Sequence, residues 1–170
     1  EDAIKSRLLG PWPVVAAWAV GGVAILVLEP RLRRGAGSTR LEQIAPRQAL
    51  LIGLAQIVAL WPGTSRSLMT ILAALAVGLT LAAAVEFSFL MGLATLGAAT
   101  TYELAVNGGE LFEIYGWTAP LIGLAVSFVA AAVAVKWLVS YLQRHSLAIF
   151  GWYRLALAAV VGSLVLTGAI

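Results

Sequence analysis

A short polar cluster interrupts an otherwise apolar stretch of this chain and limits what the chain can fold into. The cluster occupies residues 61–67 with the sequence WPGTSRS, and it contains one arginine and three hydroxyl side chains. The dozen residues on either side are apolar except for Gln56 and Thr70. An arginine at membrane depth costs roughly 3 kcal/mol on insertion scales, so an ionisable group there indicates a functional site. Because the polar groups are bunched, the cluster predicts an anion held inside the bilayer.

The composition is that of an integral membrane protein. Of the 170 residues, 61% are hydrophobic and 11% are charged, whereas a soluble domain has about 25% charged residues. The chain has no cysteine, which excludes a disulfide and a thiolate metal site. The formal net charge is +3. Its distribution among the loops is more informative than the total, because basic residues in loops indicate the orientation of the protein in the membrane. We therefore expect a bilayer and no nucleic acid as the surroundings of this chain.

Four segments are long enough to cross a bilayer, which takes about 20 apolar residues. Two shorter apolar stretches lie between the first and second of these, and Pro62 and Gly63 separate them. Neither short stretch crosses comfortably, so they predict a re-entrant helix-turn-helix hairpin at about 48–79 with its tip near mid-membrane. The expected fold is an all-α integral membrane protein, a single membrane domain over residues 1–170. Its expected spans are roughly 12–28, 83–106, 117–139 and 149–166.

The charged residues outside the spans predict the orientation. The 31–47 segment holds five arginines against one acidic residue, and Lys136 and Arg144 flank the connection after the third span. The 107–116 segment is expected to be a loop, with two acidic residues and no basic one. The positive-inside rule places the basic segments in the cytoplasm and the acidic segment outside. This arrangement holds only if the short hairpin enters and leaves the membrane on the same side, as a re-entrant hairpin does.

The polar cluster has the features of a phosphate site at a helix start. Thr64 or Ser65 can cap the second short helix, because a hydroxyl accepts a hydrogen bond from a free N–H one turn in. Gly63 lies in the turn before it. The N-terminal amides and the positive end of the helix dipole then face the tip of the hairpin, where a phosphate binds readily. Arg66 adds a planar fork that can bind two phosphate oxygens, a geometry that lysine does not reproduce.

Three neighbouring polar residues have both a binding and a structural interpretation. Ser67 and Thr70 follow Arg66 at helical spacing, which places Thr70 on the same face as Arg66. Gln56, earlier in the hairpin, can point into the same cavity. Alternatively, hydroxyls in membrane helices often bond to their own backbone, and a glutamine can bond to a neighbouring helix.

Glu86 lies near the start of the second span. A buried carboxylate needs a partner, and Arg66 is the obvious candidate. An alternative is that Glu86 orients a metal ion or a water molecule. We expect the structural pairing with Arg66.

The cluster and three later motifs resemble the undecaprenyl-diphosphatase family, the membrane phosphatases associated with bacitracin resistance. The family signature Pro-Gly-Thr-Ser-Arg-Ser-Gly-Ala-Thr corresponds to residues 62–70, where Leu68 and Met69 replace Gly-Ala. An Ile-Pro pair of the family is replaced by Leu93 and Ala94. Later family motifs are matched by Glu-Phe-Ser-Phe at 86–89, Arg-His-Ser-Leu at 144–147 and Trp-Tyr-Arg at 152–154.

The resemblance implies two inverted repeats with two re-entrant hairpins, and an enzyme that hydrolyses undecaprenyl diphosphate to undecaprenyl phosphate and phosphate. This reaction recycles the lipid carrier for peptidoglycan synthesis. The implied location is the bacterial inner membrane, with a site that opens to the periplasmic or extracellular face. The implied partners are a polyprenyl diphosphate lipid and the bilayer, and a homodimer is left open. The implied site residues are Arg66 and Ser65 as catalytic residues, Gly63, Thr64, Ser67, Thr70 and Gln56 in substrate binding, and Glu86 in support.

The first hairpin of the family, with its glutamate-rich signature and catalytic histidine, has no match in this sequence. The resemblance therefore implies a divalent cation, Mg²⁺ or Ca²⁺, whose ligands are expected upstream and not in this chain. We expect the chain to be the C-terminal part of such an enzyme.

Two other functions are compatible with the same residues. Inverted repeats with broken helices near the midplane are also transporter architecture, so a lipid-phosphate transporter or flippase is one alternative. A non-catalytic relative, acting as a binding or assembly subunit, is the other.

Overall fold

The computed structural model describes residues 10–34 and 37–168, without the side chains of residues 29, 31–34 and 143–144. Within this part the regular structure is helical, and the only extended pairing is a single bridge between Thr39 and Leu79. The α-helices are α2 (Pro11–Arg34), α3 (Pro46–Ala55), α4 (Arg66–Ala76), α5 (Leu81–Tyr115), α6 (Thr118–Arg144) and α7 (Ala148–Leu166), and the 3₁₀ helices are η1 (Leu41–Gln43) and η2 (Gln56–Leu60).

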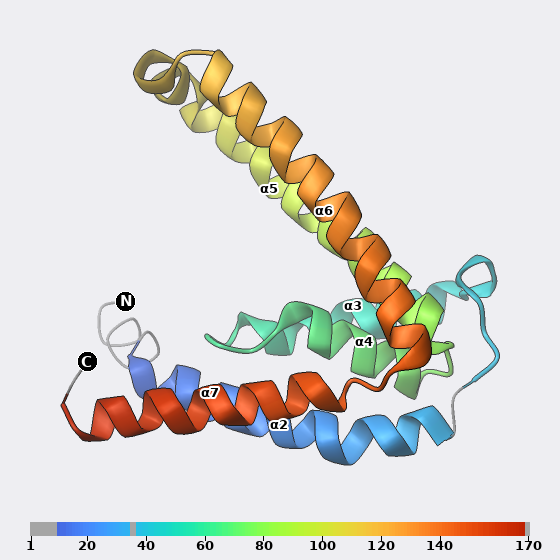
Figure 1. Cartoon of the computed structure of the whole chain (residues 1–170). Coiled ribbons are helices and arrows are strands. Elements are labelled where there is room, and N and C mark those ends of the chain that lie inside the picture. The colour runs from blue at the N-terminus through green and yellow to red at the C-terminus, as the bar shows by residue number, and fades with distance from the viewer. Residues whose placement is uncertain (1–9, 35–36, 169–170) are drawn as a thin grey trace.

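The helices form two antiparallel pairs that diverge (Figure 1). The α2 and α7 helices lie side by side, and the α5–α6 pair extends away from them at an angle. In the described part of the chain, four helices are long and apolar enough to cross a membrane, namely the α2 segment Pro11–Leu28, all of α5, Thr118–Leu142 of α6, and α7. These correspond to the predicted spans. The all-α integral membrane fold predicted from the sequence is therefore confirmed.

The α3, η2 and α4 helices form the predicted helix-turn-helix hairpin. The two ends of the hairpin are held together, because Gln48 Nε2 donates to the carbonyl of Val77 at 2.8 Å. Thr39 adds to this base, since its N–H donates to the Gly78 carbonyl at 3.3 Å and its carbonyl accepts from the Thr80 N–H at 3.1 Å. A hairpin whose ends meet supports entry and exit on one side. Its depth in a membrane stays a prediction.

The protein core surrounds α4. This helix buries Leu68, Ile71, Leu72 and Leu75, and the buried cluster continues into α3, the start of α5 and the end of α6. Irregular backbone is tolerated at membrane depth only where protein or a polar cavity covers it. α4 is packed into the core, where it contacts α2, α3, η2 and α5. The turn before it is only partly covered, since Trp61 is exposed.

The predicted loop at 107–116 is wrong, because α5 continues as a helix to Tyr115. Asn107 donates from Nδ2 to Glu103 Oε2 at 2.8 Å, one turn earlier, which supports the helix across the two following glycines. The helix ends at Gly116, whose φ of 65° is left-handed. With 35 residues, α5 is about 52 Å long, whereas the hydrocarbon core is about 30 Å thick. The helix is therefore longer than a perpendicular span requires, and the position of its acidic end outside the membrane stays a prediction.

The structure describes only part of the two basic segments that predict the orientation in the membrane. Arg40 and Arg47 are exposed. The side chains of Arg31, Arg33, Arg34 and Arg144 lie outside the described residues. The cytoplasmic placement of these segments stays a prediction.

Candidate functional site

The turn before α4 is fixed by a glycine and by contacts with the start of α2. Gly63 has a φ of 84°, and a Cβ at this position would lie 2.9 Å from the carbonyl oxygen of Val14. Both the left-handed backbone and the lack of space require glycine. The Thr64 N–H donates to the Trp61 carbonyl at 3.1 Å, which closes the turn. Trp61 Nε1 donates to the Pro13 carbonyl at 3.3 Å, so the turn is held against α2.

Of the two capping residues that the sequence offers, Thr64 and Ser65, the structure shows that Ser65 caps α4. Its Oγ accepts a hydrogen bond from the Leu68 N–H at 3.2 Å. The amides of the first helical turn have no carbonyl one turn earlier to bind, so the remaining donors and the positive end of the helix dipole face the turn. This is the local geometry that suits an anion.

Arg66 is the first residue of α4, and its side chain is exposed. Its Nη1 donates to Thr95 Oγ1 of α5 at 3.1 Å. The Thr95 hydroxyl in turn donates to the Met91 carbonyl at 2.9 Å, which fixes its orientation. A guanidinium has several N–H donors, and the bond to Thr95 uses one of them. Arg66 is therefore oriented by α5 while part of its donor fork stays available.

The predicted pairing of Arg66 with Glu86 is wrong. Both residues are described, no ion pair joins them, and Glu86 is exposed. The head of Arg66 reaches Thr95, which is nine residues beyond Glu86 on the same helix. That separation corresponds to about 13 Å along the axis of α5. Glu86 is not buried by the described residues, so burial inside the protein does not require a pairing with Arg66.

Thr70 lies in the core and not beside the guanidinium of Arg66. Its side chain is 1% exposed, and its Oγ1 lies 2.7 Å from Ser88 Oγ on α5. The hydroxyl also lies 3.1 Å from the carbonyls of Arg66 and Ser67. Thr70 thus bonds to its own backbone, which is the alternative considered for hydroxyls in membrane helices. It links α4 to α5 below the open surface.

The remaining hydroxyls of the cluster face two different cavities. Ser65 and Ser67 line a cavity of about 280 Å³ together with residues of α6 and α7, among them Tyr153 and Arg154. Thr64 instead lines a larger, mainly apolar groove of about 680 Å³ between the hairpin and α2. Thr64 is therefore separated from Ser65 and Ser67 in these two cavities.

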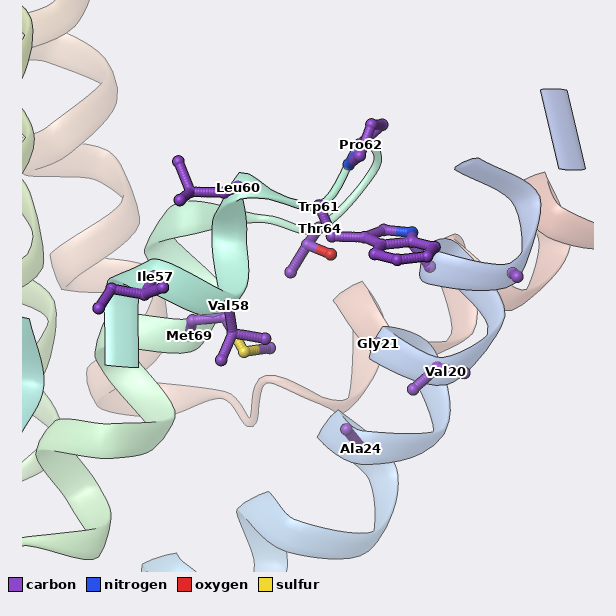
Figure 2. Close-up of a pocket in the computed structure, with 12 residues that line it drawn as sticks. Val20, Gly21, Ala24, Ile57, Val58, Leu60, Trp61, Pro62, Thr64 and Met69 are labelled. Atoms are coloured by element: carbon purple, nitrogen blue, oxygen red, sulfur yellow. The ribbon is translucent and has the colours of Figure 1, made fainter. Parts of the chain in front are cut away.

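Figure 2 shows the groove at the hairpin tip. Trp61, Pro62 and Thr64 lie at one end of it, and small residues of α2 line the opposite side. Gln56 lines neither this groove nor the smaller cavity. Its Oε1 is buried and accepts no hydrogen bond from the described residues. The cavity position expected for Gln56 is thus not observed in these two pockets.

Sequence reasoning gave no role to two residues that contact the cluster. Thr95 is one of several hydroxyl residues in its predicted span, and nothing in its local sequence indicates its contact with Arg66. Arg154 belongs to the Trp-Tyr-Arg motif, and its Nη2 donates to the Gly63 carbonyl at 2.9 Å. The signal for Arg154 was available, because an arginine inside a predicted span is itself a sign of a functional or strongly constrained position.

A metal site cannot be built from the described side chains. Among the described side chains, which do not include that of Glu29, no group of three or more His, Asp or Glu residues comes together. The described residues therefore do not fit a divalent cation, and the chemistry considered below takes no step through one.

Comparison with known proteins gives consistent matches over nearly the whole chain. The family model of the bacitracin resistance protein BacA matches residues 1–160. An undecaprenyl-diphosphatase of Sorangium cellulosum is 48% identical over 164 residues, which are 95% of this chain and 53% of that protein. Undecaprenyl-diphosphatase 2 of Rhodospirillum rubrum is 44% identical over 160 residues, 94% of this chain and 57% of that protein. An undecaprenyl-diphosphatase of Burkholderia mallei is 40% identical over 164 residues, 95% of this chain and 59% of that protein. The chain thus spans somewhat more than half the length of these relatives.

Proposed function

This chain belongs to the family of the bacitracin resistance protein BacA, and from that membership we propose that it takes part in the hydrolysis of undecaprenyl diphosphate. The products are undecaprenyl phosphate and inorganic phosphate, and the reaction returns the lipid carrier to peptidoglycan synthesis. The names of the similar proteins support this activity. The observation that carries the proposal is the head of α4, where Arg66 presents an exposed guanidinium beside a capped helix start.

The proposed role of this half-site is to bind the diphosphate and to stabilise charge. Phosphoryl transfer needs little covalent chemistry from the protein and depends mainly on positioning and electrostatics. The free donors of Arg66 bind oxygens of the transferred phosphate, and the first amides of α4 add further donors. The Ser65 hydroxyl already caps the helix, so we propose that it holds these amides in place while its remaining lone pair and proton face the phosphate. Donors fixed in advance are the main source of such transition-state stabilisation.

The substrate lipid and the membrane fit the arrangement of the helices. Substrate binding by Gly63, Thr64 and Ser67 is part of the same proposal, because these residues surround the start of α4. The diphosphate lies at the polar turn, and the prenyl chain stays among apolar surfaces. The proposed location is the bacterial inner membrane, with the site open to the outer face. A homodimer is a further proposal, and its test is the mass of the purified protein in detergent.

A divalent cation, Mg²⁺ or Ca²⁺, is proposed from the family resemblance alone. Its ligands, and the group that activates the nucleophile, would come from residues other than those described here. The test is phosphate release after removal of divalent cations with a chelator. We expect activity to be lost and to return when Mg²⁺ or Ca²⁺ is added back, and unchanged activity in the chelator would contradict this part of the proposal.

The test of the function is phosphate release from undecaprenyl diphosphate by the purified protein, as its gene encodes it, in detergent. We expect inorganic phosphate to appear in proportion to the loss of diphosphate lipid. Movement of the lipid across a vesicle membrane without release of phosphate would contradict the proposal and favour a transporter. Lipid binding with neither activity would favour a non-catalytic relative.

A further inference from the structure

The guanidinium of Arg154 joins three elements at the tip of the hairpin. From α7, its Nη2 donates to the Gly63 carbonyl in the turn at 2.9 Å and to the Ala17 carbonyl of α2 at 3.3 Å. The guanidinium also lies directly over Gly21 of α2. A Cβ at Gly21 would be 2.9 Å from Nη2 and 3.0 Å from Nε, so a side chain at this position would displace the guanidinium.

These contacts hold the turn in one orientation. The Gly63 carbonyl belongs to a left-handed residue that already lies against the backbone of Val14. A hydrogen bond from a charged donor is roughly twice as strong as one between neutral groups, and it is stronger still in a medium of low dielectric. Three residues after Gly63, α4 begins at Arg66. The direction of the helix start therefore depends on where Arg154 holds the turn.

We infer that Arg154 is a positioning residue, which fixes the Gly63 turn against the α2–α7 pair and so aims the start of α4 and its Arg66. Arg154 itself makes its described hydrogen bonds to backbone carbonyls and not to the side chains of the cluster. It lines the same small cavity as Ser65 and Ser67, so it lies close to the start of α4. The consequence for catalysis rests on the proposed function.

The contact geometry explains why an arginine is needed at this position. The flat guanidinium fits over Gly21 while one nitrogen bonds two carbonyls on different elements. A lysine has a compact ammonium on a flexible stem and lacks the planar group. We therefore expect Arg154→Lys to keep the positive charge but to hold the Gly63 turn in its orientation much less well.

The first test measures the position of the turn without any turnover. The chain has no cysteine, so Leu60→Cys and Val23→Cys, both at exposed positions, provide unique sites for two spin labels. We expect a narrow distribution of distances between the labels in the otherwise unchanged protein, and a broad or shifted one with Arg154→Gln. The matched control is Lys136→Gln, which removes one exposed cation from α6 and should leave the distribution narrow. An unchanged distribution in Arg154→Gln would overturn the inference.

Two further variants keep the test decisive if Arg154→Gln does not fold. Arg154→Lys should give an intermediate broadening. Gly21→Ala should displace the guanidinium while leaving the arginine in place, and so should reproduce the effect of Arg154→Gln. Gly21→Ala and Arg154→Gln break the same contact. The distance distribution of the double variant should therefore be no broader than that of either single variant. Narrow distributions in both Arg154→Lys and Gly21→Ala would also overturn the inference.

The second test separates positioning from direct phosphate binding. A displacement of about 1 Å can lower turnover about 10²-fold, so we expect Arg154→Gln to lower kcat by roughly this factor while KM changes far less. A higher KM with unchanged kcat and unchanged label distances would indicate direct phosphate binding and overturn the inference. If the unsubstituted protein releases no phosphate, the proposed function fails, while the distance measurement still decides the part played by Arg154.

Discussion

Nη1 of Arg66 lies 3.1 Å from Oγ1 of Thr95, and this hydrogen bond orients the arginine at the head of α4. The two residues are on different helices, and the threonine hydroxyl is itself held by the Met91 carbonyl. The contact leaves other donors of the guanidinium available. It also shows that α5 supports the candidate site through a neutral hydroxyl and not through the carboxylate of Glu86.

Replacing Thr95 by valine should weaken the proposed enzyme without abolishing it. The hydrogen bond is exposed, so we expect its loss to reduce transition-state stabilisation by about 1.5 kcal/mol, the lower end of the range for bonds to charged groups. This corresponds to about a tenfold loss of kcat/KM. The measurement is phosphate release at several substrate concentrations. The matched control is Thr101→Val, six residues further along α5, whose exposed hydroxyl bonds only to the Gly97 carbonyl. Equal losses in the two variants would contradict a specific role for Thr95.

Replacing Gly63 by alanine should strain the turn. A left-handed backbone costs a residue with a side chain roughly 1 to 2 kcal/mol, and the new Cβ would also lie 2.9 Å from the Val14 carbonyl oxygen. We expect a lower unfolding temperature in detergent together with lower phosphate release. Gly53→Ala is the control, since no atom lies within 4 Å of a Cβ there. Alanine in that helix interior should be neutral or stabilise by about 0.5 to 1 kcal/mol. If both variants unfold at the same temperature, the account of the turn is wrong.

The pair formed by Thr70 and Ser88 should matter for stability. Thr70→Val removes the 2.7 Å contact and leaves a buried hydroxyl on Ser88, at a cost of roughly 1 to 3 kcal/mol. Ser88→Ala should cost less, because the Thr70 hydroxyl still reaches two backbone carbonyls. Since the two residues interact directly, the double variant should lose less stability than the two single variants together. Strictly additive losses in thermal unfolding would show that the contact contributes little.

The topology can be tested by labelling single cysteines from one side of the membrane. A cysteine at Ser38 and one at Ser146 lie in the two basic segments, and Asn107 lies near the acidic end of α5. With a re-entrant hairpin, an impermeant thiol reagent should label the first two positions from the same side and Asn107 from the opposite side. Labelling of Ser38 and Ser146 from opposite sides would mean that the hairpin segment crosses the membrane once.

The sequence is sufficient to predict the fold class, the four spans and the short hairpin, because length and apolar composition determine these features. It also narrows the cap of α4 to Thr64 or Ser65, since capping depends on residues within one turn. The end of α5 is mispredicted as a loop, because adjacent glycines and acidic residues resemble a loop when the Asn107–Glu103 contact is not known. Local sequence signals therefore predict which helices form but not the residues at which they end.

The candidate site is harder to predict because its contacts join residues that are far apart in the chain. Arg66 and Thr95 are on separate helices, and no local pattern indicates that their side chains meet. Arg154 and Gly63 are 91 residues apart. The direction in which Thr70 points depends on how α4 packs on α5, and the hydroxyl is satisfied in the core. Residue type thus predicts an anion site, and the packing decides which side chains form it.

We propose that the guanidinium fork of Arg66 binds the transferred phosphate, and the most direct test is to measure phosphate release from undecaprenyl diphosphate by Arg66→Lys. Loss of one such charge-stabilising group costs about 10²- to 10³-fold in kcat. We expect Arg66→Ala to abolish measurable activity. Arg66→Lys should lose nearly all activity as well, because lysine keeps the charge but not the bidentate geometry. Near-normal turnover by Arg66→Lys, with folding unchanged, would contradict the account.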